Sequence, residues 1–314
     1  MQIKNGDISK TITSALREAA ANQILILDGA MGTMVQSALP DHKGLADILN
    51  IEKPEVIRDI HRRYLEAGAD IVTTNTLSSQ RISMAECGYA DRIRELNLAG
   101  VSIARKLADE YTALNSRKPR FVAASIGPTA MMASKEGEAK RQTLREAYQE
   151  QAEAVIEGGA DALLIETIFD IVSAETACEA AEAAMEKLGK RVELMLSMTI
   201  NNDGRTFAGH TMEQLVDLAD RYNALSVGLN CSFGAKNIVP FVEELVSKTS
   251  RMISVHPNAG LPDSTGCYKE TPESFASALK PLIESRTVNI IGGCCGTDER
   301  HIRQLHSLVS KLFA

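Results

Sequence analysis

The sequence contains no tryptophan, and aromatic residues make up only 4% of its 314 residues. So few aromatic side chains do not suggest a stacking platform for single-stranded nucleic acid. A basic excess is also missing, because 34 lysine and arginine residues stand against 41 aspartate and glutamate residues, for a formal charge of −7. Nucleic-acid-binding proteins usually carry a basic patch or stripe. We therefore expect no nucleic-acid partner.

Long apolar runs are absent as well, since no stretch approaches the roughly 18 consecutive apolar residues of a membrane span. The opening residues, MQIKNGDISK, contain no apolar core of a secretory signal peptide. These absences predict a cytoplasmic protein with no membrane partner. In a reducing compartment the six cysteines are not a disulfide framework, so each is a buried bystander, a metal ligand or a nucleophile.

The sequence does contain one alternation that repeats eight times. Short runs rich in isoleucine, valine and leucine, typical of strands covered on both faces, alternate with helical patterns such as 54–67, 143–157 and 272–284. The runs are 24–31, 69–76, 121–128, 162–167, 193–200, 225–231, 251–260 and 289–296. Eight consecutive βα units predict an α/β fold, the (β/α)8 TIM barrel. An open dinucleotide-binding sheet is disfavoured because no G-x-G-x-x-G follows the first run.

The domain organisation predicted from the sequence is simple. No linker or change in composition divides the chain, so we predict one barrel domain over residues 22–314. Residues 1–21 form an N-terminal extension in which 8–21 resemble an extra helix. This helix either covers one end of the barrel or lies solvated on the surface, and the pattern favours neither.

Polar and thiol groups follow the expected strands at the point where each strand ends. The carboxyl ends of the strands carry the active site in TIM-barrel enzymes. The candidate residues at these ends are Asp28, Gly29, Glu166, Asn230, Cys231, Asn258, Cys294 and Cys295. We therefore expect these residues to lie at one rim of the barrel.

The sharpest signal is the position of three cysteines. Cys231 ends the sixth strand and Cys294 and Cys295 end the eighth, and neighbouring strands lie about 4.8 Å apart. The glycines on either side of the cysteine pair allow the backbone to turn, so that both thiolates can converge. Three protein ligands with an open fourth position are typical of a catalytic zinc site. Two other interpretations remain: small buried residues in a tight turn, or a phosphate site built from backbone N–H groups.

A zinc site with three thiolates favours one kind of chemistry. Its net charge of about −1 makes the ion a poor Lewis acid for water and carbonyls. The site suits a soft fourth ligand, namely a substrate thiol that ionises near neutral pH and remains nucleophilic. The expected reaction is attack of that thiolate on an activated methyl group.

Six motifs together resemble the homocysteine S-methyltransferase family, and within it most closely the homocysteine-binding barrel of cobalamin-dependent methionine synthase. They are DGAMGT, EAGADIVTTNT, GGADALLIET, GLNCSFG, HPNAGLP and IIGGCCGT, and the resemblance covers about residues 22–312. The resemblance implies a zinc-bearing (β/α)8 barrel that transfers a methyl group to L-homocysteine and yields methionine.

The resemblance also assigns roles to the candidate residues. It implies zinc ligands at Cys231, Cys294 and Cys295, a homocysteine site that includes Asp28, Gly29 and Glu166, and an Asn230 that orients the neighbouring ligand or the substrate. From its position in the barrel topology, Asn258 is a further hypothesis: a temporary oxygen ligand when the substrate is absent. The implied donor is methylcobalamin, carried with folate-binding parts on modules of the same or another chain. Betaine or S-methylmethionine, used by a stand-alone enzyme, is the second possibility.

Two alternatives belong to other classes of protein. A Schiff-base aldolase is disfavoured because no lysine occurs in the eight strand segments. A non-catalytic zinc-binding interaction module remains open, because a fold does not determine a function. The roles of His256 and Met198 also remain open.

Overall fold

The computed structural model describes residues 14–135 and 137–313, and its eight strands confirm the expected alternation. The strands are β1 (Leu25–Ile26), β2 (Ile71–Thr73), β3 (Phe121–Ile126), β4 (Ala162–Ile168), β5 (Glu193–Met198), β6 (Ser226–Gly234), β7 (Met252–Asn258) and β8 (Ile290–Ile291). Each apolar run recognised in the sequence overlaps one of these strands. The first and last strands are the shortest, because the chain leaves regular pairing early there to form the rim loops.

Helices follow the strands and surround them. The α-helices are α1 (Ala15–Asn22), α2 (Gly32–Ala38), α3 (Leu49–Glu52), α4 (Pro54–Ala67), α5 (Arg81–Ala85), α6 (Ile93–Leu114), α7 (Glu138–Glu157), α8 (Ile171–Leu188), α9 (Met212–Arg221), α10 (Ala235–Ser247), α11 (Pro272–Glu284) and α12 (Glu299–Phe313). Three short 3-10 helices are η1 (Ala46–Ile48), η2 (Ala90–Arg92) and η3 (Ala133–Lys135). Local signals explain several ends: the Thr271 hydroxyl caps α11, and Gly68 ends α4 with a left-handed φ of 108°.

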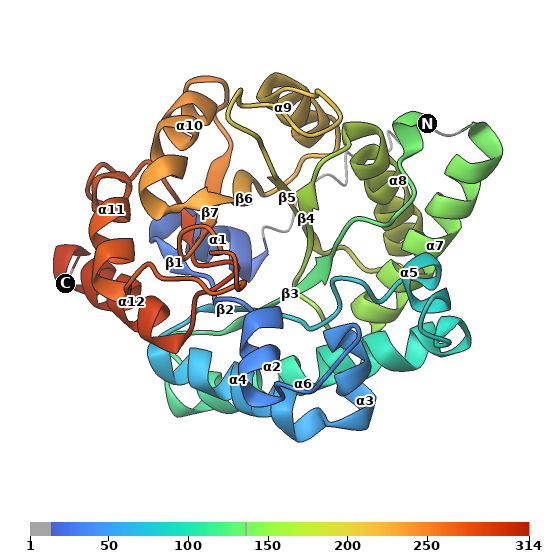
Figure 1. Cartoon of the computed structure of the whole chain (residues 1–314), viewed down its shortest axis with the longest axis horizontal. Helices are drawn as coiled ribbons and strands as arrows, with labels where there is room; N and C mark the ends of the chain where they lie inside the picture. The colour runs from blue at the N-terminus through green and yellow to red at the C-terminus, as the bar shows by residue number, and fades with distance from the viewer. Residues whose placement is uncertain (1–13, 136, 314) are drawn as a thin grey trace, which may run out of the picture.

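The strands close into a barrel. They form one parallel sheet in the order β1-β8-β7-β6-β5-β4-β3-β2. A parallel bridge between Leu27 and Ile71 joins the two ends of this sheet, and the Asp28 N–H donates to the Ile71 carbonyl at 3.0 Å. Figure 1 shows the strands around the centre and the helices outside them. The predicted (β/α)8 TIM barrel is therefore confirmed.

Helix α1 packs against one end of the barrel. Its buried residues Leu16 and Ala20 belong to the same apolar cluster as buried side chains from β1, β2, β3, β4, β5 and β8. The Arg17 guanidinium and Ser14 hydroxyl donate to the carboxylate of Glu193, which begins β5. The described part of the expected N-terminal helix thus covers the amino end of the barrel, and residues 8–13 of the predicted helix lie outside the described residues. An active site is therefore expected at the opposite, carboxyl end of the barrel.

Candidate metal centre and substrate cavity

A cavity of about 380 Å³ opens at the carboxyl end of the barrel. Its walls combine residues that lie in or just after β1, β2, β3, β4, β6, β7 and β8, and they include Asp28, Glu166, Cys231, His256 and Cys294. Side chains that are far apart in the sequence therefore share one chamber, because parallel strands all end at the same rim.

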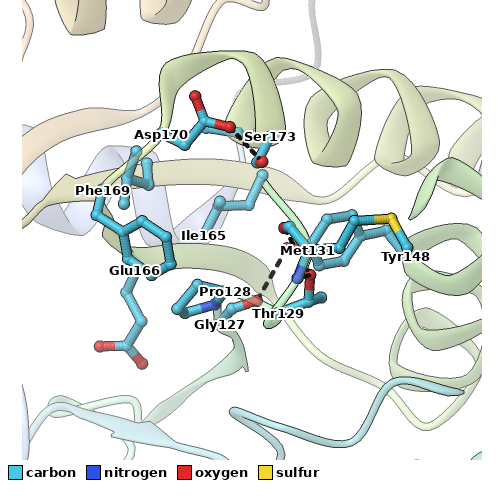
Figure 2. Close-up of a pocket in the computed structure, with 12 residues that line it drawn as sticks. Gly127, Pro128, Thr129, Met131, Tyr148, Ile165, Glu166, Phe169, Asp170 and Ser173 are labelled. Carbon is cyan, nitrogen blue, oxygen red and sulfur yellow. Dashed lines mark hydrogen bonds between the residues drawn. The ribbon is translucent and has the colours of Figure 1, made fainter. Parts of the chain in front are cut away.

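Glu166 also borders a second cavity, on the other side of the β4 segment. Figure 2 shows this cavity beside Met131, Tyr148 and Asp170, while the carboxylate of Glu166 points away from them. Its volume of about 20 Å³ has room for about one water molecule. The larger cavity is consequently the one that can hold a substrate.

Three cysteine thiols converge in the larger cavity. Cys231 lies near the end of β6, and Cys294 and Cys295 lie in the turn that follows β8. The sulfur atoms all lie within 4.8 Å of one another, and Cys231 Sγ is 3.5 Å from Cys295 Sγ. Among the described residues, this is the only group of three or more metal-ligating side chains that close together. The geometry fits one ion with sulfur distances of about 2.3 Å.

The backbone is bent at both places that supply these thiols. Cys231 has a φ of 53°, a conformation that a non-glycine residue rarely adopts, and the pairing of β6 with β7 shifts between Asn230 and Gly234. On the other side, Gly296 has a φ of 81°, as expected for a glycine that turns the chain after the cysteine pair. Gly293 acts differently: a Cβ there would lie 2.4 Å from Thr297 Oγ1, so this glycine permits close packing rather than a left-handed turn.

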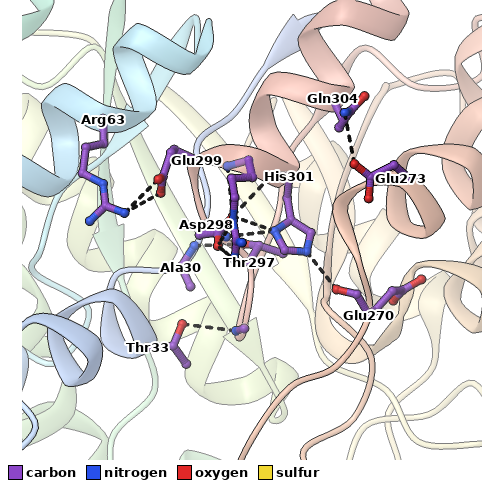
Figure 3. A network of polar contacts seen from close by, with 12 residues as sticks. Ala30, Thr33, Arg63, Glu270, Glu273, Thr297, Asp298, Glu299, His301 and Gln304 are labelled. Atoms are coloured by element: carbon purple, nitrogen blue, oxygen red, sulfur yellow. Dashed lines mark hydrogen bonds and ion pairs between the residues drawn. The ribbon is translucent and has the colours of Figure 1, made fainter.

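A polar network holds the cysteine turn in place (Figure 3). The Thr297 hydroxyl donates to the Cys294 carbonyl at 2.7 Å, and the Ala30 N–H donates to the same hydroxyl at 3.2 Å. The Gly296 N–H donates to the Thr33 hydroxyl at 3.2 Å. The turn that carries two of the three thiols is thus tied to the segment after β1. Such supporting hydrogen bonds position the ligands of a metal site.

The thiols perturb one another strongly. Hydrogen bonds from Cys231 and Cys294 lower the pKa of the Cys295 thiol far below its ordinary value. Hydrogen bonds to the Cys231 and Cys295 sulfurs raise the pKa of Cys294. In this cluster one thiolate accepts hydrogen bonds from two thiols. A metal cation that replaced the shared protons would bind all three sulfurs as thiolates.

Asp28 lies at the floor of the cavity and is only 1% exposed. Its two oxygens accept hydrogen bonds from the Thr73 N–H at 2.8 Å and from the Thr73 hydroxyl at 2.9 Å. Burial raises the pKa of Asp28 well above its ordinary value, and the nearby Glu166 carboxylate raises it further. The next residue, Gly29, lines the cavity, and its N–H donates to no described residue.

Glu166 and Asn230 belong to a second connected group. The Ser125 hydroxyl and, at 3.4 Å, the Asn230 amide donate to the Glu166 carboxylate. Asn230 is fully buried, and its Oδ1 accepts from the Ser197 hydroxyl at 2.7 Å and the Thr167 N–H at 3.1 Å. Burial raises the pKa of Glu166 to about 7, although the hydrogen bond from Ser125 opposes this shift. A cationic group in the cavity would restore the charged form of this carboxyl.

The remaining sequence candidates are divided between the site and the core. Asn258 ends β7 at the same rim but is not among the residues that line the cavity, and its buried Oδ1 has no hydrogen-bond partner among the described residues. His256 lines the cavity, and its buried Nε2 is also unpartnered there. Met198, in contrast, is fully buried in the apolar layer between strands and helices and does not line the cavity.

Several polar residues of the cavity were missed by sequence reasoning. Thr73, Ser125 and Asp47 all line it. Thr73 donates a hydrogen bond to Asp28, Ser125 donates one to Glu166, and Asp47 accepts one from Ser79. Thr73 and Ser125 lie at the carboxyl ends of their strands. The rule that the active site of a TIM barrel lies at these strand ends, which identified Glu166, therefore applies to them as well. Asp47 lies in η1, and no local pattern distinguishes it from an ordinary loop aspartate.

A closed (β/α)8 barrel with three thiols at the carboxyl end of its strands defines a barrel enzyme with a metal-competent cysteine site. The family model for homocysteine S-methyltransferase matches residues 25–309, and the chain belongs to this family. It is therefore an S-methyltransferase, and homocysteine is the methyl acceptor of the family.

Solved structures of similar proteins agree with this assignment. The metallated form of the homocysteine methyltransferase MmuM from Escherichia coli is 25% identical, with a TM-score of 0.78 over 93% of this chain and 99% of that one. Its oxidized form is 23% identical, with a TM-score of 0.75 over 90% of this chain and 95% of that one, and this second likeness supports the fold. Within residues 14–135 and 137–313, no helix combines the length and the apolar character needed to cross a bilayer.

Proposed function

We propose that the protein methylates the thiolate of L-homocysteine to give methionine, with a zinc ion held by Cys231, Cys294 and Cys295. The observation that carries this proposal is the convergence of these three sulfurs at the wall of a cavity of about 380 Å³. A site of three protein ligands leaves one position for the substrate sulfur.

The donor set fits zinc by its chemistry. Thiolates are soft ligands that favour zinc over magnesium or calcium, and three of them within 4.8 Å can share one ion. When bound, zinc would lower the pKa of the homocysteine thiol and supply a thiolate near neutral pH. The unpartnered Oδ1 of Asn258 is a candidate for a temporary oxygen ligand when homocysteine is absent.

The amino-acid end of homocysteine matches the polar floor of the cavity. The carboxylates of Asp28 and Glu166 repel each other there, so a substrate ammonium between them would relieve that repulsion. The free N–H of Gly29 can donate to the substrate carboxylate. Asn230 binds both Glu166 and the Thr167 backbone beside it, so we assign it the role of orienting Glu166.

Two kinds of methyl donor are candidates for this reaction. The sequence resemblance favours methylcobalamin, delivered by cobalamin- and folate-binding modules of the same or another chain. A small donor such as betaine or S-methylmethionine is favoured by the cavity itself, since no lysine or arginine lines it among the described residues. Both candidates share the acceptor, the metal and the product.

The experiment that tests the function measures zinc content and methionine formation with methylcobalamin, betaine and S-methylmethionine in turn. Cys231→Ala and Cys294→Ala should each lose most of the bound zinc and of the activity. Cys267→Ala is the matched control, because Cys267 is exposed in the loop before α11 and should retain both. Full zinc occupancy in Cys231→Ala would refute the ligand assignment.

A non-catalytic zinc-binding module is the alternative of another class, and one titration separates the two. In the proposed enzyme, homocysteine should release about one proton per site as its thiol ionises, and methionine should not. A module that only stores zinc or binds a partner should show no thiol-dependent proton release.

A further inference from the structure

The cavity contains a third carboxylate, Asp47, for which the methyl acceptor has no obvious use. Asp47 lies in η1, between β1 and α4, and is 4% exposed. Its Oδ1 accepts hydrogen bonds from the Ser78 N–H and the Ser79 hydroxyl, both at 2.8 Å. Its Oδ2 accepts no hydrogen bond from any other described residue, and Asp47 lines the cavity. One oxygen therefore fixes the side chain, and the other is available to a ligand.

The charge of the cavity is not balanced by the protein. Asp28, Glu166 and Asp47 all line it, and the only basic side chains among its described lining residues are His42 and His256. Homocysteine brings one ammonium, and that group is already matched by Asp28 and Glu166. A buried carboxylate without a cation is costly, and burial accordingly raises the pKa of Asp47 to about 6.

The cavity also lacks the usual alternative for binding a cation. Aromatic rings hold quaternary ammonium groups by cation–π attraction. No phenylalanine or tyrosine is among the described residues that line this cavity; Tyr268, whose hydroxyl hydrogen-bonds the Cys295 sulfur, is not one of them. Carboxylates are therefore the lining groups that offer a second cation an opposite charge. In addition, His256 is 2% exposed and its Nε2 has no partner there, which indicates that the cavity is built to be completed by a ligand.

We propose that Asp47 binds the positive charge of a small methyl donor, a sulfonium or a quaternary ammonium, in the cavity that also holds the thiol acceptor. This inference rests on the proposed function and extends it to the donor. Asp47 and the cysteine thiols line one continuous chamber, so donor and acceptor can meet without a second protein module.

The transfer itself balances without a further reagent. The thiolate sulfur attacks the methyl carbon, the new S–CH3 bond forms, and the bond from that carbon to the onium sulfur or nitrogen breaks. The leaving group keeps the electron pair and departs as a neutral thioether or tertiary amine, while the thiolate charge is lost. Positive charge on the donor therefore declines on the way to the transition state.

This decline determines the kinetic signature of Asp47. A carboxylate beside the onium group stabilises the bound donor more than the transition state. Loss of its charge should raise KM for the donor while kcat stays the same or rises. A role confined to folding or to loop packing would not separate the two constants in this way.

The test compares Asp47→Asn with Asp41→Asn. Asparagine keeps an oxygen for Ser78 and Ser79 and removes only the charge, whereas Asp41 is exposed in the same loop and serves as the control. With betaine or S-methylmethionine, whichever the wild type uses, Asp47→Asn should raise donor KM about tenfold or more, the effect of about 1.4 kcal/mol. KM for homocysteine and zinc content should be unchanged, kcat should stay the same or rise, and Asp41→Asn should behave as wild type.

Two outcomes would overturn the inference while leaving the proposed function intact. One is a wild-type protein that makes methionine from methylcobalamin alone. The other is an Asp47→Asn variant whose donor KM is unchanged, or whose homocysteine KM alone rises, which would place the substrate ammonium at Asp47. Failure of the wild type to bind homocysteine would instead refute the proposed function.

Discussion

Gly293→Ala would test whether the turn that carries Cys294 and Cys295 depends on close packing against Thr297. A Cβ at position 293 would lie 2.4 Å from Thr297 Oγ1, 2.7 Å from Cγ2 and 2.8 Å from Cβ. Thr297 has little room to retreat, because it is 1% exposed and its hydroxyl is bound to the Cys294 carbonyl and the Ala30 N–H. The added methyl group must therefore displace the turn.

The size of the effect follows from overpacking. Adding a methyl group to a closely packed site costs about 1–3 kcal/mol, which lowers the melting temperature of a chain of this size by roughly 2–6 °C. Displacement of two thiols should also weaken zinc binding by about 10–100-fold, the usual cost of disturbing groups that orient metal ligands. Calorimetry measures the first effect, and competition with a chromophoric chelator measures the second.

The control for this variant is Gly32→Ala, at the start of α2 on the same rim. A Cβ there would meet nothing within 4 Å, so stability and zinc affinity should stay close to wild type. The double variant Gly293→Ala with Thr297→Ala should be less damaged than the sum of the two single variants, since it removes the closest contacts. A Gly293→Ala protein with wild-type melting temperature and zinc affinity would refute this account of the turn.

Three further predictions concern stability. Burial raises the pKa of Asp47 from 3.8 to about 6, so between these pH values the folded protein binds a proton that the unfolded chain does not. The free energy of unfolding should therefore fall as the pH rises from 3.8 to about 6. In denaturant titrations, Asp47→Asn should lose this pH dependence and be more stable than the wild type at pH 7. Leu16→Ala should lower the free energy of unfolding by about 2–4 kcal/mol because Leu16 is buried at the amino end of the barrel, whereas Leu114→Ala, at an 80% exposed position, should lower it by less than about 0.5 kcal/mol. Equal losses for the two variants in urea unfolding would contradict the packing of α1. Tyr64→Phe should cost about 1–2 kcal/mol by leaving the Ala30 carbonyl without its 2.6 Å hydrogen bond, and unchanged unfolding would mean that water replaces it.

The convergence of the three cysteines could be predicted from the sequence for a geometric reason. Cys231 and the Cys294–Cys295 pair each follow an apolar run, and a parallel barrel brings the ends of all its strands to one rim. The same rule placed Asp28 and Glu166 correctly beside the cavity. The local pattern of apolar residues shows where each strand ends, so side chains tied to strand ends can be recognised from the sequence alone.

Other features could not be predicted, because they depend on contacts between distant segments. Asp47 belongs to the site only because η1 folds over the cavity and Ser78 and Ser79 hold its carboxylate. The contact between Gly293 and Thr297 is local, but its closeness depends on how tightly the turn packs, and the glycines in the sequence indicated only that the backbone can turn there. The sequence also left the role of Met198 open, and the pleat of β5 directs this side chain to the outer apolar layer.

The central claim is that three cysteine sulfurs bind one zinc ion and leave a position for the substrate thiol. Zinc X-ray absorption of the loaded protein tests it directly. We predict three sulfur neighbours at about 2.3 Å and one lighter atom, changing to four sulfur neighbours when homocysteine is added. Four sulfur neighbours before homocysteine, or a spectrum that homocysteine leaves unchanged, would contradict it.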